Sequence, residues 1–298
     1  MEQRYPFVAV DASPDEVDEL SAAFFELGAM GVEERDDQTL IKGAGSGRVT
    51  LVGSFEDRGA AESAIEELLV MSPACGARLE EVVGDAWRDA WKEHFAPFLL
   101  TRHIRVVPPW VADAPLNKGE IRLELEPGRA FGTGLHATTS LVAELLDDRS
   151  QALAGEEVLD VGTGSGILAF AALLLGASRA TAIDTDADVI PVVLENAERN
   201  GLSHRLRAFA GGIEDIDRAY PWVLANIEAR VLRPLAPRLV RALEPGGVLI
   251  LSGLLESEHD EMVRLYKAQG RRLAHIETRR RPGAGDDAWI ALVLADVT

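Results

Sequence analysis

The sequence predicts an α/β protein in which a mostly parallel sheet, covered by helices on both faces, follows a small α+β domain. From residue 138 onward, apolar runs typical of buried strands alternate with helical stretches, and repeated strand–helix units of this kind form parallel sheets. Residues 1–84 instead predict the order strand–helix–strand–strand–helix–strand. A length of 298 residues accommodates about two domains.

The order of the first elements is that of a ferredoxin-like fold. Ser13 and Pro14 predict the start of the first helix, because serine is favoured at the N-cap and proline at the first helical position. Gly28 predicts the end of this helix. A second helix is predicted over residues 56–70, where apolar residues recur at helical spacing. Strands are expected over residues 4–10, 48–54 and 79–83, and two β-rich pieces, residues 31–35 and 38–42, precede the strand at 48–54.

Residues 85–119 are expected to link the two domains. Trp87, Trp91 and Phe95 follow one another at intervals of four residues, so they share one face of a predicted helix. This apolar stripe favours packing of the linker on a neighbouring domain. Prolines at positions 97, 108, 109 and 115 then interrupt regular structure.

The second domain is predicted to span residues 120–298. Its expected strands are 121–125, 157–161, 180–184, 206–209, 222–226, 248–252, 272–279 and 288–295. Its expected helices are 138–146, 166–175, 187–200, 229–243 and 257–269. The last two strands are joined across residues 281–285, a connection too short for a crossover, so one edge of the sheet is expected to be antiparallel.

Composition bounds the class of protein. Apolar residues make up 47% of the chain, and no apolar run approaches the roughly 18 residues that span a bilayer, so neither disorder nor a membrane protein is expected. The first ten residues lack the pattern of a secretory signal, and the single cysteine, Cys75, excludes an internal disulfide framework and a cysteine-cluster metal site. We therefore expect a cytoplasmic protein, and a monomer because no large apolar stripe is left unassigned.

Acidic charge is concentrated at the N-terminal end. The chain carries a net charge of −19, and its first 84 residues, with 6 basic and 18 acidic side chains, account for −12. Such a surface repels nucleic-acid phosphates and favours a basic partner, although acidity can also serve solubility alone. We expect no direct binding of nucleic acid.

A glycine-rich turn after a buried strand is the strongest chemical signal. The turn, residues 162–166, reads Gly-Thr-Gly-Ser-Gly and leads directly into a helix, where backbone amides favour a phosphate or carboxylate. Its spacing departs from the Gly-x-Gly-x-x-Gly of dinucleotide folds, because Ile167 occupies the sixth position. Asp184 ends the next strand, at the sheet edge where ligands bind. Its carboxylate can accept hydrogen bonds from both hydroxyls of a ribose.

This pair of signals resembles the class I S-adenosylmethionine-dependent methyltransferases, which have a Rossmann-like sheet. Two further motifs narrow the resemblance. Residues 127–140 read Pro-Gly-Arg-Ala-Phe-Gly-Thr-Gly-Leu-His-Ala-Thr-Thr-Ser, which indicates a loop closing over a ligand with Thr138 or Thr139 donating to it; Thr138 also suits a helix N-cap. Asn226, in Ala-Asn-Ile at the end of another strand, can accept hydrogen bonds from an amine and orient it.

Together these motifs resemble the ribosomal protein L-11 methyltransferases from about residue 85 to the end of the chain. The resemblance implies a substrate-recognition role for the domain of residues 1–84. It also implies methylation of amino groups, chiefly lysine side chains, on a basic protein of the large ribosomal subunit. The cofactor would be S-adenosyl-L-methionine, and the residues expected to bind it are Thr139, Gly162, Gly164, Asp184 and Asn226.

Little acid–base chemistry is expected from the enzyme. The methyl group of the cofactor is already activated, so the main task is alignment of the acceptor. A lysine amine, whose pKa is about 10.4, must lose a proton, and desolvation in an apolar crevice favours that loss. We expect no catalytic nucleophile and no metal, and His136 is either a base or a residue that positions the loop. Glu228 and Arg230 stand where the family often has smaller or apolar residues, which leaves the acceptor open.

Two alternatives remain. The first is a methyltransferase of the same fold that acts on another protein, a small amine or RNA. Base-amine methyltransferases commonly carry Asn/Asp-Pro-Pro-aromatic where this chain has Asn-Ile-Glu-Ala at residues 226–229, which argues against nucleic acid. The second is a scaffold that binds the cofactor without catalysis.

Overall fold

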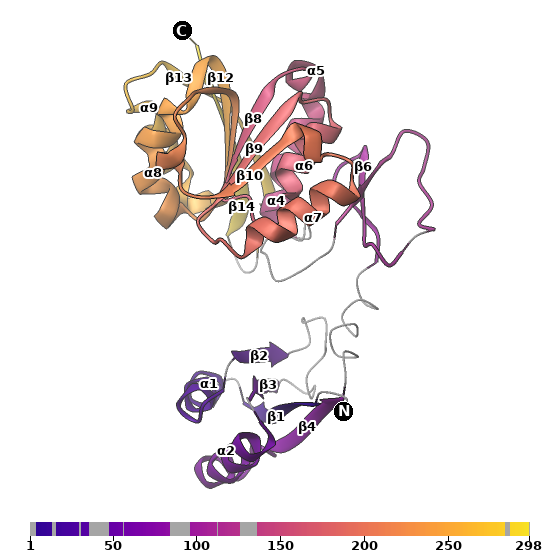
Figure 1. Cartoon of the computed structure of the whole chain (residues 1–298). Helices are drawn as coiled ribbons and strands as arrows, with labels where there is room; N and C mark the ends of the chain where they lie inside the picture. The colour runs from indigo at the N-terminus through magenta and orange to yellow at the C-terminus, as the bar shows by residue number, and fades with distance from the viewer. Residues whose placement is uncertain are drawn as a thin grey trace. The chain divides into compact units, whose positions relative to one another are not determined.

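The structure is a computed structural model, and it describes residues 4–13, 16–29, 31–35, 48–55, 57–83, 96–111, 113–125, 136–283 and 287–297. The chain divides into two compact units, Met1–Phe95 and Ala96–Thr298. Figure 1 shows the elements of both units. The expected domain boundaries at residues 84 and 119 stay predictions. The β-rich piece at 38–42 and the stripe of Trp87, Trp91 and Phe95 lie outside the described residues.

The first unit has the predicted ferredoxin-like order. Its elements are β1 (Arg4–Ala12), α1 (Val17–Glu26), β2 (Gly31–Arg35), β3 (Val49–Ser54), α2 (Arg58–Met71) and β4 (Arg78–Val83). The strands pair in the order β2-β3-β1-β4, and every pair is antiparallel. Both helices contribute to one apolar core, in which Phe24 of α1 and Leu68 of α2 are fully buried.

The predicted start of the first helix is wrong. Helix α1 begins at Val17 with Glu16 at the N-cap, and Ser13 lies before it. The backbone N–H of Ser13 donates to Glu16 Oε2 (3.0 Å), and the Ser13 hydroxyl donates to the same oxygen (2.5 Å). The serine therefore closes a turn ahead of the helix, because its partner is the side chain of Glu16 and not a helical amide.

The second unit contains the seven-stranded sheet that positions the site. Its strand order is β10-β9-β8-β11-β12-β14-β13. The first five strands are parallel, and β14 is antiparallel to both its neighbours, as the short final connection predicts. The strands are β8 (Glu157–Val161), β9 (Arg179–Asp184), β10 (Leu206–Ala210), β11 (Tyr220–Asn226), β12 (Leu243–Leu255), β13 (Leu273–Pro282) and β14 (Ala288–Asp296).

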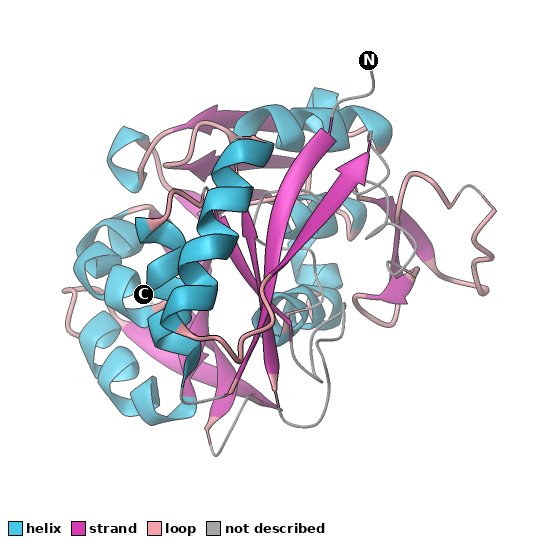
Figure 2. Cartoon of the chain, turned by 90° about the horizontal axis from the view of Figure 1, so that it is seen from below, coloured by secondary structure: helices cyan, strands magenta, loops and turns pink. Residues whose placement is uncertain are grey.

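Helices cover both faces of this sheet (Figure 2). The helices are α4 (Ala137–Asp148), α5 (Ser150–Leu153), α6 (Ile167–Leu174), α7 (Val189–Arg199), α8 (Ala229–Arg241) and α9 (His259–Lys267). Val158 packs with α4, α6 and α7, whereas its neighbour Leu159 packs with α8 and α9. Successive strand residues point to opposite faces, so a strand covered on both sides is apolar throughout.

A small second sheet opens this unit, and only its last strand was predicted. It consists of β5 (Phe98–Leu99), β6 (Ile104–Val107) and β7 (Ile121–Glu124). Ile104 and Leu123 are fully buried in the same core as α4. The Nδ1 atom of His103 lies 2.6 Å from Asp147 Oδ1 at the end of α4, so charged and apolar contacts together attach this sheet to the helix.

Candidate functional site

The glycine-rich turn follows β8 at the carboxyl edge of the parallel strands. Gly162, Gly164 and Gly166 have φ values of +70°, +52° and +84°, a region that only glycine adopts without strain. The backbone N–H of Gly162 donates to the carbonyl of Ile183 on β9 (2.9 Å). A Cβ atom on Gly162 would lie 2.8 Å from Cδ1 of Ile227, the residue that follows β11. The turn therefore sits between the ends of β9 and β11.

Asp184 meets this turn, as its place at the end of β9 predicts. Its Oδ2 atom accepts from the backbone N–H of Gly164 (2.9 Å), and its Oδ1 atom accepts from that of Asp186 (3.0 Å). An ionised carboxylate has about four acceptor positions. Two of them are used here, so each oxygen keeps a position for a ligand hydroxyl.

Asn226 and Thr139 are joined directly. Thr139 is buried in the first turn of α4, and its Oγ1 atom accepts from Nδ2 of Asn226 at the end of β11 (3.2 Å). The remaining amide oxygen, Oδ1 of Asn226, is buried and has no hydrogen-bond partner. Buried acceptors are nearly always paired in native proteins, so a lone one at this edge indicates a site for an N–H or O–H donor of a ligand.

His136, not Thr138, caps helix α4. The helix begins at Ala137, and the backbone N–H of Thr138 donates to Nδ1 of His136, which has an extended backbone conformation. The predicted N-cap at Thr138 is wrong because that residue is already helical. The ring of His136 packs edge-on against Trp289, with 4.9 Å between the ring centroids. These contacts favour the positioning role over that of a base. The motif residues before His136 lie outside the described part of the chain.

The sequence reasoning missed the role of Asp160 in the turn. This carboxyl group is fully buried near the end of β8, and Oγ1 of Thr163 donates to its Oδ2 atom (2.6 Å). Burial raises the pKa of Asp160 to about 6, and the nearby Asp184 carboxylate adds to the rise. An acid within the apolar run of β8 is the signal that marks it. Ile227, which packs against Gly162, carries no comparable signal.

The structure therefore brings the five expected site residues to one edge of the sheet. Four of them form two hydrogen-bonded pairs, and the fifth packs beside them. Asp184 contacts Gly164, Asn226 contacts Thr139, and Gly162 lies against the residue after Asn226. The arrangement offers acceptors for ribose hydroxyls at one end and a buried amide oxygen at the other. Across the described ranges, no three His, Cys, Asp or Glu side chains are grouped as metal ligands would be.

Comparison with known proteins agrees with this geometry. The family model described as Ribosomal protein L11 methyltransferase (PrmA) matches residues 4–295. A protein of that name from Sorangium cellulosum is 64% identical over 98% of this chain and 96% of its own length. Its namesake from Pelotomaculum thermopropionicum is 33% identical over 96% of each chain. The crystal structure of a ribosomal protein L11 methylase from Lactobacillus delbrueckii subsp. bulgaricus is 30% identical, with a TM-score of 0.60 over 68% of this chain and 99% of that one.

Proposed function

The chain belongs to the ribosomal protein L11 methyltransferase family, and we propose that it transfers methyl groups from S-adenosylmethionine to amino groups of ribosomal protein L11. The family match carries this proposal, since it covers both units and the whole candidate site. The chain is thus an S-adenosylmethionine-dependent methyltransferase of the class I fold, and its acceptor amines are chiefly lysine side chains.

The hydrogen-bonded pairs at the sheet edge fit this cofactor. When bound, S-adenosylmethionine supplies a methyl group on a positively charged sulfur. Gly162 and Gly164 have no side chains of their own, which lets a ligand approach the backbone of the turn. Asp184 accepts from the ribose hydroxyls with the acceptor positions that its two backbone partners leave open.

Asn226 and Thr139 complete the site at the reacting end. The hydrogen bond from Asn226 to Thr139 uses the amide nitrogen and fixes the orientation of the amide, which leaves the buried Oδ1 atom as an acceptor for the substrate. That oxygen accepts from an N–H of the acceptor amine and aims the nitrogen lone pair. The neutral amine is required, and removal from water lowers its pKa.

The acidic N-terminal residues are proposed to recognise the substrate. A net charge of −12 within residues 1–84 attracts a basic protein and speeds its encounter with the enzyme. Binding of L11 that does not weaken with added salt would contradict this role. No helix in the described residues has both the length and the apolar character needed to cross a bilayer. We place the reaction in the cytoplasm because ribosomal proteins are assembled there.

Purified protein, labelled S-adenosylmethionine and unmodified L11 test the proposal. Label is expected in L11 with the wild-type chain and with Asn117→Ala, a control at an exposed asparagine of the same unit. Asn226→Ala should transfer little label while keeping its fold. Adding ribosomal extract separates the alternatives, because label found in RNA or a small amine, or nowhere, contradicts the proposal.

A further inference from the structure

A run of arginines lies at the amino edge of the large sheet, opposite the candidate active site. Parallel strands all begin at one edge and end at the other, so this edge is separated from Asp184 and Asn226 by the length of the strands. The run follows the strand order β10, β9, β8, β11 and continues to the end of α8. We call it the arginine edge, and it consists of Arg179, Arg205, Arg207, Arg218, Arg238 and Arg241.

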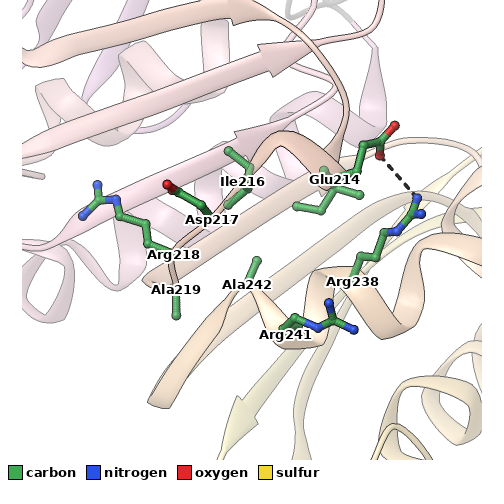
Figure 3. A pocket seen from close by; sticks show the side chains of 9 residues that line it. Glu214, Ile216, Asp217, Arg218, Ala219, Arg238, Arg241 and Ala242 are labelled. Atoms are coloured by element: carbon green, nitrogen blue, oxygen red, sulfur yellow. Dashed lines mark hydrogen bonds and ion pairs between the residues drawn. The ribbon is translucent and has the colours of Figure 1, made fainter.

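Two adjoining pockets open on the arginine edge. The first, of about 340 Å³, lies between the segment before β11 and the end of α8 and is lined by Arg218, Arg238 and Arg241 (Figure 3). The second, of about 330 Å³, is lined by Arg179, Arg207 and their neighbours at the start of β9 and β10. Arg218 lines both pockets, so they form one continuous basic surface.

Among the side chains that line the two pockets, positive charge exceeds negative charge. The six arginines share the two pockets with only three acids, Glu157, Glu214 and Asp217, which leaves a local charge of +3 in a chain of −19. Arg218 pairs with Glu157, and Arg238 pairs with Glu214 (3.3 Å). The structure gives Arg179 no carboxylate partner among the described residues.

Arg205 and Arg207 make contacts that leave their positive charge intact. Arg205 donates to the carbonyl of Ala177 (3.2 Å), and the guanidinium of Arg207 lies over the ring of Phe209, 4.9 Å from its centroid. Neither contact cancels the positive charge. Arg238 and Arg241 lie in the last turn of α8, where they offset the helix dipole, so the charge available to a ligand is concentrated on β9 and β10.

We propose that the arginine edge binds the phosphate backbone of RNA. Guanidinium groups match phosphate oxygens with paired N–H donors, and every cation of this surface is an arginine. From β10 to β11 the run crosses three strand spacings, about 15 Å, which suits successive phosphates along a strand. The choice of RNA rests on the proposed function, because a ribosomal protein is a substrate that associates with RNA. The expectation of no nucleic-acid binding rests on the acidic charge of residues 1–84 and on the lack of an Asn/Asp-Pro-Pro-aromatic motif, and neither describes this local excess of arginine.

The test uses the full-length chain and a fluorescently labelled RNA oligonucleotide of mixed sequence. Arg179→Gln/Arg207→Gln removes two charges from the arginine edge, and Lys118→Gln/Arg264→Gln removes two from exposed positions elsewhere in the same unit. Anisotropy is measured over a series of salt concentrations. Methyl transfer to RNA-free L11 is measured for each variant in parallel.

The wild type and the control should bind RNA, and more weakly as salt rises. The arginine-edge variant should bind about fivefold or more weakly at low salt, with the slope of log affinity against log salt reduced by about 0.7 for each phosphate that is no longer neutralised. All three should methylate L11 alike, because the substituted residues belong neither to the candidate site nor to residues 1–84. No RNA binding by the wild type, or equal binding by both variants, overturns the inference. Absence of methyl transfer by the wild type would instead contradict the proposed function.

Discussion

Substituting Gly162 by alanine tests the packing of the glycine-rich turn. The residue has a φ of +70°, where an L-residue costs about 1–2 kcal/mol. The new Cβ would lie 2.8 Å from Cδ1 of Ile227, and such overpacking adds a cost of about 1–3 kcal/mol. Gly162→Ala should therefore lower the free energy of unfolding of the second unit by about 2–5 kcal/mol.

The cost of the contact with Ile227 can be separated from the cost of the positive φ. Ile227→Ala removes the side chain that the new methyl group meets, so the double variant should recover about 1–3 kcal/mol relative to the sum of the single changes. Urea unfolding followed by tryptophan fluorescence and far-UV circular dichroism gives all four free energies. Strict additivity would refute the contact between the two residues.

The same variants report on the cofactor. Calorimetric titration with S-adenosylmethionine should show weaker binding for Gly162→Ala, because the strained backbone and the contact with Ile227 distort the turn that is proposed to hold the ligand. If the double variant regains stability but still binds S-adenosylmethionine weakly, the ligand lies against Gly162 itself. Unchanged affinity in the folded single variant would refute the cofactor role of this turn.

Three further predictions concern the other residues of the site. Asp184→Asn replaces one acceptor oxygen by an NH₂ donor that faces a backbone N–H. The free energy of cofactor binding, measured by calorimetry, should weaken by about 1.5–3 kcal/mol, or roughly ten- to hundredfold. A smaller loss would argue against the role of Asp184 in binding the ribose. Thr139→Val removes the hydroxyl that accepts from Asn226, so kcat for methylation should fall. Thr139→Ser keeps the hydroxyl and should retain the wild-type kcat. Equal kcat values for the valine and serine variants would mean that the hydroxyl does not orient the amide. Burial raises the pKa of Asp160 to about 6, so between about pH 4 and 6 the folded chain retains a proton that the unfolded chain has lost. The free energy of unfolding of the wild type, relative to that of Asp160→Asn, should therefore fall by about 3 kcal/mol as pH rises through this window and then level off. Urea unfolding of both proteins across the pH range measures this difference. A difference that does not change with pH would contradict the prediction.

Periodicity and turn chemistry predict the main sheet because its signals are local. Strands β8 and β9 are short, mainly apolar runs bounded by glycine or polar residues, and the brief connection before β14 requires the antiparallel edge. Strand β6 escaped prediction because it has four residues and is followed by two prolines. Its pairing with β7 joins segments far apart in the sequence, which no local pattern reports.

In the candidate site, too, local sequence patterns predict some features, whereas others depend on tertiary contacts. Gly162 and Asp184 follow from their position at strand ends, since parallel strands bring those ends to one edge. The hydrogen bond between Thr139 and Asn226 depends on where α4 crosses β11, which is a tertiary property. The N-cap at His136 was also missed, because histidine lacks the capping preference of threonine and takes the role through its ring nitrogen.

The attachment of β5 and β6 to helix α4 has a consequence for the candidate site. His103 and Arg102 engage the acids at the end of the same helix that carries Thr139 at its start. A substitution that loosens this attachment, such as Asp147→Ala, is thus transmitted along α4 to the position of the Thr139 hydroxyl and to the amide that it orients.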